Sequence, residues 1–195
     1  MIFYFKVKYK IYLFSFGLSK LQFYIFKMEY IVNRNIESLE EIINEVPRGC
    51  NTLVCRNKGL RSLRGIDRLP QITTLRVENN QIESLQGIVG SNVIYLYIDN
   101  NQIISLEHIV GSNVTHLYIR NNQITSLQGI VGSNVTHLVI ENNQIASLRE
   151  IVESNVLYLY ISSNPCYDEF VELGNSIEKV KERYSFLDVK DPGFE

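Results

Sequence analysis

Apolar and polar positions recur with a fixed period along most of the chain. Four consecutive blocks of 21 residues align with one another without a gap, and they begin at Leu75, Leu96, Leu117 and Leu138. A more divergent block of 22 residues precedes them from Leu53, and a sixth copy begins at Leu159 before the pattern stops. A fixed period of this length is typical of solenoids, in which each repeat adds one coil to a shared core.

Each block combines a short strand with a helical return path. In the segment 96–98 apolar positions alternate with an outward position, which is strand periodicity, and a pair of asparagines then ends the strand in a turn. Ile103, Leu106 and Ile109 follow at three-residue spacing, which predicts a 3₁₀-like return to the next strand. Stacked blocks are therefore expected to bury their Leu, Ile and Val columns behind a parallel sheet.

The repeated pattern L-x-V/I-x-x-N-x-I-x-x-L-x-x-I resembles the leucine-rich repeat. One copy reads Leu117, Ile119, Asn122, Ile124, Leu127 and Ile130. Its length is similar to that of the short class of 21 to 22 residues found in internalins and in a regulatory subunit of protein phosphatase 1. The resemblance implies an α/β solenoid whose concave face is a parallel sheet of about six short strands, with a helical cap at each end. It also implies protein recognition rather than catalysis.

Residues 1–27 differ in composition from the rest of the chain. They hold 10 of the 21 Phe and Tyr residues, and they hold five lysines without any acidic residue. Lysines interrupt the apolar runs before they reach the about 20 residues that a membrane-spanning helix needs. We expect the mature protein to begin at Met28 and to leave this leader out. The alternative is a membrane-anchored or secreted repeat protein that uses the leader.

Both ends of a solenoid expose core and need caps. Residues 28–50 are predicted to form an N-terminal cap helix, with Asn35 as N-cap and Pro47 as stop. Its apolar stripe consists of Ile36, Leu39, Ile42, Ile43 and Val46. The repeats then occupy 51–165, and 166–195 are expected to form a C-terminal cap. That cap is similar to the one of intracellular leucine-rich repeat proteins at Asn164, Pro165, Cys166, Val180, Tyr184, Phe186, Leu187 and Asp188.

Charge and cysteine usage narrow the function classes. Outside the leader, 14 basic residues stand against 21 acidic ones, whereas a nucleic-acid binder needs a basic face. The three cysteines lack metal-type or disulfide-framework spacing, which favours a reducing cytoplasmic or nuclear location.

His116 and His137 occupy equivalent positions in neighbouring repeats, but a zinc site needs three or four ligands. No phosphate loop or catalytic triad is recognisable, so we expect no enzyme activity, cofactor, metal or small-molecule substrate.

The second asparagine of each pair is predicted to be structural. Next to the buried columns, an amide that both donates and accepts can satisfy backbone groups released by the turn. This predicted ladder consists of Asn80, Asn101, Asn122, Asn143 and Asn164. The preceding asparagines, such as Asn121, are expected to face solvent.

Strand alternation leaves two aromatic-rich columns and one charged column on the concave face. In the charged column, Arg120 is expected to pair with both Asp99 and Glu141 across neighbouring strands. Tyrosine is enriched at interface hot spots, so this face is the predicted partner site. Its candidate residues are Tyr95, Tyr97, His116, Tyr118, Arg120, His137, Tyr158 and Tyr160.

These observations together predict a monomeric, non-catalytic scaffold that binds a partner protein on the concave face of the arc. The leading alternative is a regulatory adaptor that recruits an enzyme such as a phosphatase or a ubiquitin ligase. Co-purification of an enzyme would distinguish the two, and cell fractionation would identify the membrane-anchored or secreted form.

Overall fold

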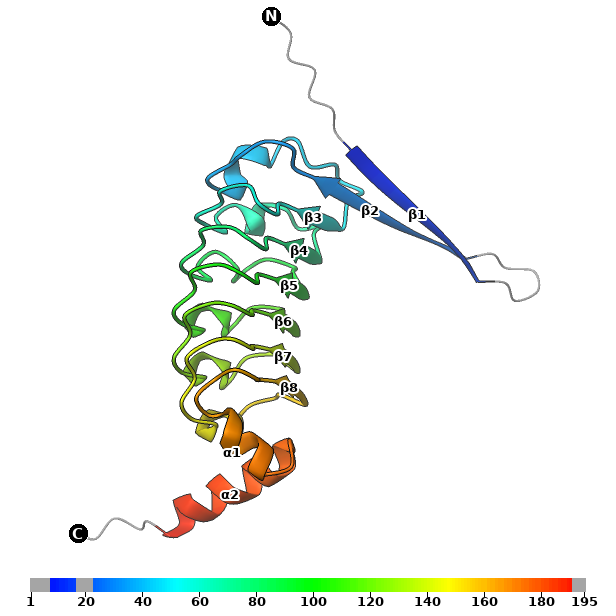
Figure 1. Ribbon diagram of the computed structural model, residues 1–195. Helices are drawn as coiled ribbons and strands as arrows, with labels where there is room; N and C mark the ends of the chain where they lie inside the picture. The colour runs from blue at the N-terminus through cyan, green and yellow to red at the C-terminus, as the bar shows by residue number, and fades with distance from the viewer. Residues whose placement is uncertain (1–7, 17–22, 191–195) are drawn as a thin grey trace, which may run out of the picture.

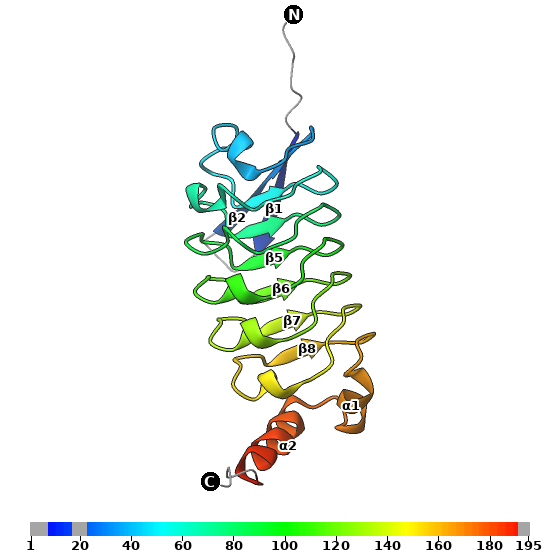
Figure 2. The same cartoon turned by 90° about the vertical axis from the view of Figure 1, so that its left-hand side faces the viewer.

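The computed structural model describes residues 8–16 and 23–190 (Figure 1). These residues form an α/β solenoid, an open arc of stacked coils with the strands along one side and the turns along the other. Figure 2 shows β5 to β8 at the same place in successive coils. Among the described residues, no helix is both long and apolar enough to cross a membrane.

One sheet of eight strands runs through the arc in chain order. Its strands are β1 (Lys8–Phe16), β2 (Phe23–Ile31), β3 (Thr52–Val54), β4 (Thr74–Arg76), β5 (Tyr95–Tyr97), β6 (His116–Tyr118), β7 (His137–Val139) and β8 (Tyr158–Tyr160). The strands β2 to β8 are parallel, and β1 pairs antiparallel with β2 in a hairpin that leans away from the arc (Figure 1). The predicted strands at the six repeat leucines are confirmed as β3 to β8.

The three-residue strands follow from the sequence of each repeat. The central leucine of each strand from β3 to β7 is fully buried, whereas its two neighbours lie on the concave face. The third residue after each of β4 to β7 is an asparagine with a left-handed backbone. Its φ is 53° at Asn121. Asparagine tolerates this conformation better than most residues, so it can turn the chain out of the strand direction.

The return path is a short 3₁₀ turn in four of the five complete repeats, as predicted, whereas the repeat between β4 and β5 returns through turns without a 3₁₀ helix. The turns are η2 (Ile66–Arg68), η3 (Glu107–Ile109), η4 (Gln128–Ile130) and η5 (Arg149–Ile151). A buried serine closes the turn after η3, since the Ser112 hydroxyl donates to the carbonyl of Ile109 at 2.8 Å. Equivalent serines do the same in the neighbouring coils, and the sequence reasoning did not assign this role to them.

The N-terminal end differs from the predicted cap helix over 28–50. Strand β2 runs through Met28 to Ile31, and the helical part is a single 3₁₀ turn, η1 (Leu39–Ile42), that begins after Ser38 instead of Asn35. The Glu41 carboxylate accepts from the backbone N–H of Ser38 at 3.2 Å, which anchors this start.

The residues of the predicted stripe still reach the core, because the segment 30–50 forms one more coil of the solenoid. Tyr30 pairs in register with Leu53 and is 3% exposed, so it takes the place of the repeat leucine. Leu39 and Ile42 are fully buried behind it. The pairing with β3 uses Glu29, Tyr30 and Ile31, so a chain that starts at Met28 retains it. Residues 1–7 and 17–22 of the predicted leader lie outside the described residues.

Two helices follow the last coil at the C-terminal end. They are α1 (Tyr167–Glu172) and α2 (Ile177–Lys190). Phe170 from α1 and Val180 from α2 are buried against the end of the repeat core. The predicted cap residues Phe186, Leu187 and Asp188 belong to α2, but their side chains and the segment 191–195 lie outside the described part of the chain.

Candidate functional site

A row of four aromatic rings crosses the concave face from β5 to β8. The ring centroids of Tyr95 and His116 lie 4.5 Å apart, those of His116 and His137 lie 4.1 Å apart, and those of His137 and Tyr158 lie 4.3 Å apart. Parallel strands in register hold equivalent side chains about 4.8 Å apart, which is close to the spacing of stacked rings. The register of the repeats therefore builds a continuous stack, which we call the first row.

A second row runs beside the first, two residues further along each strand. The guanidinium carbon of Arg76 lies 4.6 Å from the ring centroid of Tyr97, which stacks on Tyr118 at 4.4 Å with an interplanar angle of 7°. Val139 is nearly buried and interrupts the aromatic sequence, and Tyr160 follows it with 58% of its surface exposed. The two rows together form a polar-tipped aromatic surface.

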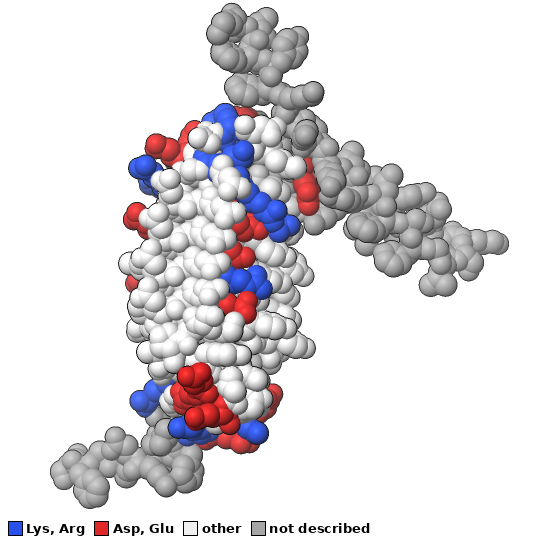
Figure 3. All heavy atoms as spheres, in the orientation of Figure 1, with Lys and Arg blue, Asp and Glu red and all other residues white. Residues whose placement is uncertain are grey.

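The charged column beside the rows is neutralised by its own ion pairs. Arg120 lies between two carboxylates, with its Nε 2.7 Å from Glu141 and its Nη1 3.6 Å from Asp99, as the alternating signs predict. Nearer the N-terminal end, Glu78 receives Arg56 at 2.7 Å and Arg76 at 3.2 Å. Figure 3 shows these blue and red groups alternating beside a wide uncharged area.

Burial and hydrogen bonds set the protonation behaviour of this face. Burial raises the pKa of Tyr97 and of Asp99 above their ordinary values. Hydrogen bonds from the Ser162 hydroxyl and from Arg120 lower the pKa of Glu141. The surface therefore keeps Tyr97 neutral and Glu141 ionised at neutral pH.

The two histidines form part of the stack and make few other contacts. The hydroxyl of Thr115 lies 2.8 Å from Nδ1 of His116, and the hydroxyl of Thr136 lies 3.0 Å from Nδ1 of His137. Burial and the neighbouring His137 lower the pKa of His116. Within the described residues, no group of three or more His, Cys, Asp or Glu side chains is placed to hold a metal ion.

The five asparagines of the predicted ladder lie in the turn behind the strands and link adjacent coils. At Asn122, the side-chain oxygen accepts from the Ile103 N–H of the preceding coil at 2.9 Å. Its amide nitrogen donates to the carbonyls of Ile98, Ile119 and Arg120 at 3.0 to 3.2 Å. Asn80, Asn101, Asn143 and Asn164 make the equivalent bonds.

A second asparagine ladder, which the sequence reasoning missed, runs along the turns that lead into the strands. The side-chain amide of Asn113 donates to the carbonyl of Ser91, and that of Asn134 donates to the carbonyl of Ser112, both at 2.8 Å. Asn92 and Asn155 make equivalent bonds. The repeated S-N-V motif carried this signal, because it places one amide at the same point of each of these four coils.

The structure places all eight predicted partner residues on the same face. Tyr95, Tyr158 and Tyr160 are exposed, and Tyr97, His116, Tyr118, Arg120 and His137 are half-buried between their neighbours. Exposure is therefore greatest on β8, at the C-terminal end of the sheet, and lower on β6 and β7 than at Tyr95. The sequence pattern did not predict the high exposure of the two β8 tyrosines.

Comparison with known proteins supports the architecture. No family model and no curated protein matches the chain. Among solved structures, internalin C2 from Listeria monocytogenes is similar, with a TM-score of 0.56 and 21% sequence identity. The similarity covers 65% of this chain and spans 57% of the length of internalin C2. The chain thus has the leucine-rich repeat fold, with a sheet of parallel strands along the concave side of an open arc.

Proposed function

We propose that this protein is a non-catalytic scaffold that binds a partner protein on the concave face of its leucine-rich repeat arc. The observation that carries the proposal is the pair of adjoining aromatic rows between β5 and β8. A solvated sheet face does not require such a concentration of rings, whereas Tyr and Arg dominate the binding energy of protein interfaces.

The electrostatics of the face indicate the kind of contact it makes. Its arginines and carboxylates are already paired with each other, so a partner need not bring a compensating charge. We propose that binding relies on the rings and their polar tips, with the ion pairs fixing the shape of the neighbouring surface.

The proposal includes a monomeric protein in the cytoplasm or the nucleus. It is supported by the buried thiols of Cys50, Cys55 and Cys166, which are not joined in disulfides. An adaptor that recruits an enzyme and a membrane-anchored or secreted form that uses residues 1–27 are the alternatives. Co-purification of an enzyme would favour the former, and recovery in the membrane fraction or the medium would favour the latter.

Affinity capture with the tagged full chain tests the concave face. Tyr97→Ala combined with Tyr118→Ala removes the centre of the second row, so capture of the partner should weaken about a hundredfold, given about 1.4 kcal/mol per tenfold. Loss of the ring pair removes about 0.5–1.5 kcal/mol of stacking in addition to the contacts of two half-buried side chains, so the unfolding free energy should fall while the core stays intact. Quantitative capture and denaturant melts of the same preparation separate the two effects.

The matched control lies on the opposite side of the arc. Gln128 is exposed on η4, so Gln128→Ala should leave both capture and stability unchanged. Unchanged affinity in a folded Tyr97→Ala, Tyr118→Ala protein would contradict the proposal.

A further inference from the structure

The C-terminal end of the sheet leaves its last coil uncovered. The repeat leucines of β3 to β7 are all 0% exposed, whereas the equivalent Leu159 of β8 is only partly buried. Its neighbours are among the most exposed apolar side chains of the described chain, with Leu157 at 66% and Tyr158 at 54%. The cap helices therefore cover the 3₁₀ side of this coil more completely than its strand.

The backbone of β8 has a free edge at the same place. In the preceding coil, the carbonyl of Thr136 accepts from the N–H of Leu157 and Tyr158, and the N–H of Ile140 donates to Tyr160. One coil later, the equivalent groups are the Leu157 carbonyl and the Ile161 N–H, and among the described residues neither has a hydrogen-bond partner. Among the described strands, β8 pairs with β7 alone. A strand edge of this kind is a template for a further strand.

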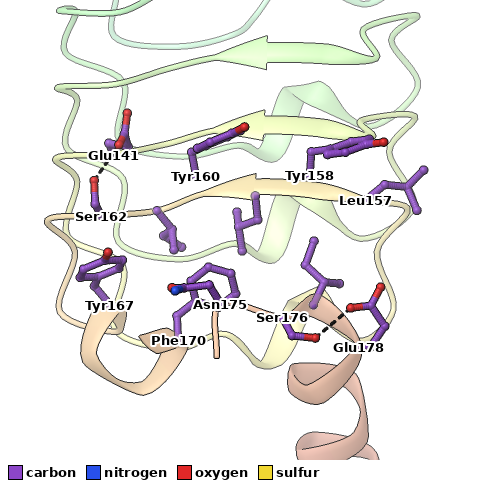
Figure 4. Close-up of a pocket in the computed structure, with 13 residues that line it drawn as sticks. Glu141, Leu157, Tyr158, Tyr160, Ser162, Tyr167, Phe170, Asn175, Ser176 and Glu178 are labelled. Atoms are coloured by element: carbon purple, nitrogen blue, oxygen red, sulfur yellow. Dashed lines mark hydrogen bonds between the residues drawn. The ribbon is translucent and has the colours of Figure 1, made fainter. Parts of the chain in front are cut away.

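A hollow of about 600 Å³ lies directly below this edge, between β8 and the cap helices (Figure 4). Tyr167 and Phe170 of α1 line one side, and Ser176 and Glu178 line the other, with Asn175 between them. The volume falls within the about 300–1,000 Å³ of ordinary ligand sites. A segment of about five extended residues, at about 3.3 Å each, would run the length of the edge.

The charge around the hollow is predominantly negative. Over residues 166–185 the cap carries five acidic side chains and three basic ones, and carboxylates crowd the cap region in Figure 3. Glu178 lines the hollow and is bonded to the Ser176 hydroxyl at 2.8 Å, whereas Glu141 at the opposite end is already paired with Arg120. A ligand that brings a positive charge to Glu178 is therefore favoured.

We propose that this hollow is a second binding site, which takes an extended peptide segment of a partner protein as a ninth strand on β8. Backbone groups of the peptide pair with the edge of β8, an apolar side chain covers Leu159, and a lysine or arginine lies beside Glu178. The site shares Tyr158 and Tyr160 with the concave face but depends on the strand edge and the hollow, so it stands apart from the proposed concave docking.

Synthetic peptides test the proposal on the full chain. The probes are fluorescein-labelled, amidated hexapeptides with a lysine at one end followed by alternating Val and Thr, in both directions of the sequence. Each is compared with a version that is N-methylated at alternate residues, which removes the backbone donors without changing the side chains. The expected result is micromolar binding by fluorescence polarisation, at least tenfold weaker binding of the N-methylated version, and slowed hydrogen exchange at Leu159 and Ile161.

One matched pair of variants and one variant of the concave face locate the site. Glu178→Arg should weaken binding of the lysine peptide at least tenfold, whereas Glu182→Arg, one turn further along α2, should change it less than twofold. Tyr118→Ala, on the concave face, should also leave peptide binding unchanged, which keeps this test independent of the proposed function. The proposal is wrong if no probe binds below 1 mM, if N-methylation has no effect, or if the chain sediments as a dimer in which Leu159 and Ile161 already exchange slowly without peptide.

Discussion

Asn121 and Asn122 are adjacent in sequence but have opposite environments. Asn122 is 8% exposed and makes four hydrogen bonds through its side chain, whereas Asn121 is exposed and has a φ of 53°. Asn122 contributes through its side-chain amide, whereas Asn121 contributes through its backbone conformation. Solvent exposure of Asn121 alone would suggest that it tolerates any substitution, but its left-handed conformation changes that expectation.

Substitution of the two asparagines should separate these roles. Asn122→Ala leaves backbone groups of two coils without partners, so the unfolding free energy should fall by about 1–3 kcal/mol. Asn121→Ala keeps the Cβ but loses the short polar side chain that lets asparagine tolerate a left-handed backbone, so it should cost about 1 kcal/mol, whereas Asn121→Gly should be close to neutral. Urea melts of the three variants provide the measurement. Equal losses in Asn121→Ala and Asn121→Gly would show that backbone conformation does not explain the position.

His116 in the ring stack should make stability depend on pH. Burial and His137 lower the pKa of His116, so the unfolded chain binds a proton in a range where the folded chain does not. The contribution of His116 is therefore fully present above its unfolded pKa of about 6.5 and is lost as the pH falls through the folded pKa. Thermal melts between pH 8 and pH 5 should show this loss, and His116→Gln should reduce it. A melting temperature with the same pH dependence in both proteins would contradict the assignment.

At the scale of the element, the extra N-terminal coil is the main departure from the sequence interpretation. Its residues are buried like those of a repeat, although their sequence spacing differs from the repeat pattern. Tyr30 occupies the position of the repeat leucine, and its hydroxyl donates to the Glu45 carboxylate at 2.9 Å. Arg34 bridges Glu41 and Glu45 across the same coil. One 3₁₀ turn is enough for this coil to bury its apolar stripe, since the end of β2 pairs with β3 and completes the coil.

Tyr30 offers a test of this coil. Removal of a buried aromatic side chain costs about 3–5 kcal/mol, so Tyr30→Ala should strongly destabilise the full chain. Tyr160→Ala removes an equivalent side chain from a position that is 58% exposed, and it should cost much less. Guanidinium denaturation of both variants would measure the difference. Similar free energies of unfolding for the two would mean that residues 30–50 do not close the core.

At the scale of the whole molecule, the solenoid creates two different surfaces from one repeat. Coils in the middle have a coil on each side, so equivalent side chains stack into rows on the concave face and each strand pairs along both of its edges. The last coil has a neighbour on one side only, and its strand edge and repeat leucine are left accessible beside the cap helices. The middle coils of a solenoid thus present equivalent surfaces, whereas its end coils present surfaces that no other coil repeats.

The sequence by itself determined the period, the positions of β3 to β8, the buried columns and the 3₁₀ return path. Each of these depends on contacts between one repeat and the next, and a regular period shows such contacts directly. It also indicated that Arg120 would lie between Asp99 and Glu141, because the register of parallel strands converts sequence spacing into proximity.

Only the tertiary structure decided what happens where the period stops. The coil over 30–50 has irregular spacing, so its membership of the solenoid depends on the pairing of β2 with β3. The accessibility of Leu159 and the free edge of β8 depend on where α1 and α2 pack, which no repeat unit encodes. A repeated local pattern specifies how equivalent coils stack on one another. The ends of the solenoid are formed by segments that do not follow the pattern, so the sequence period does not predict how they pack.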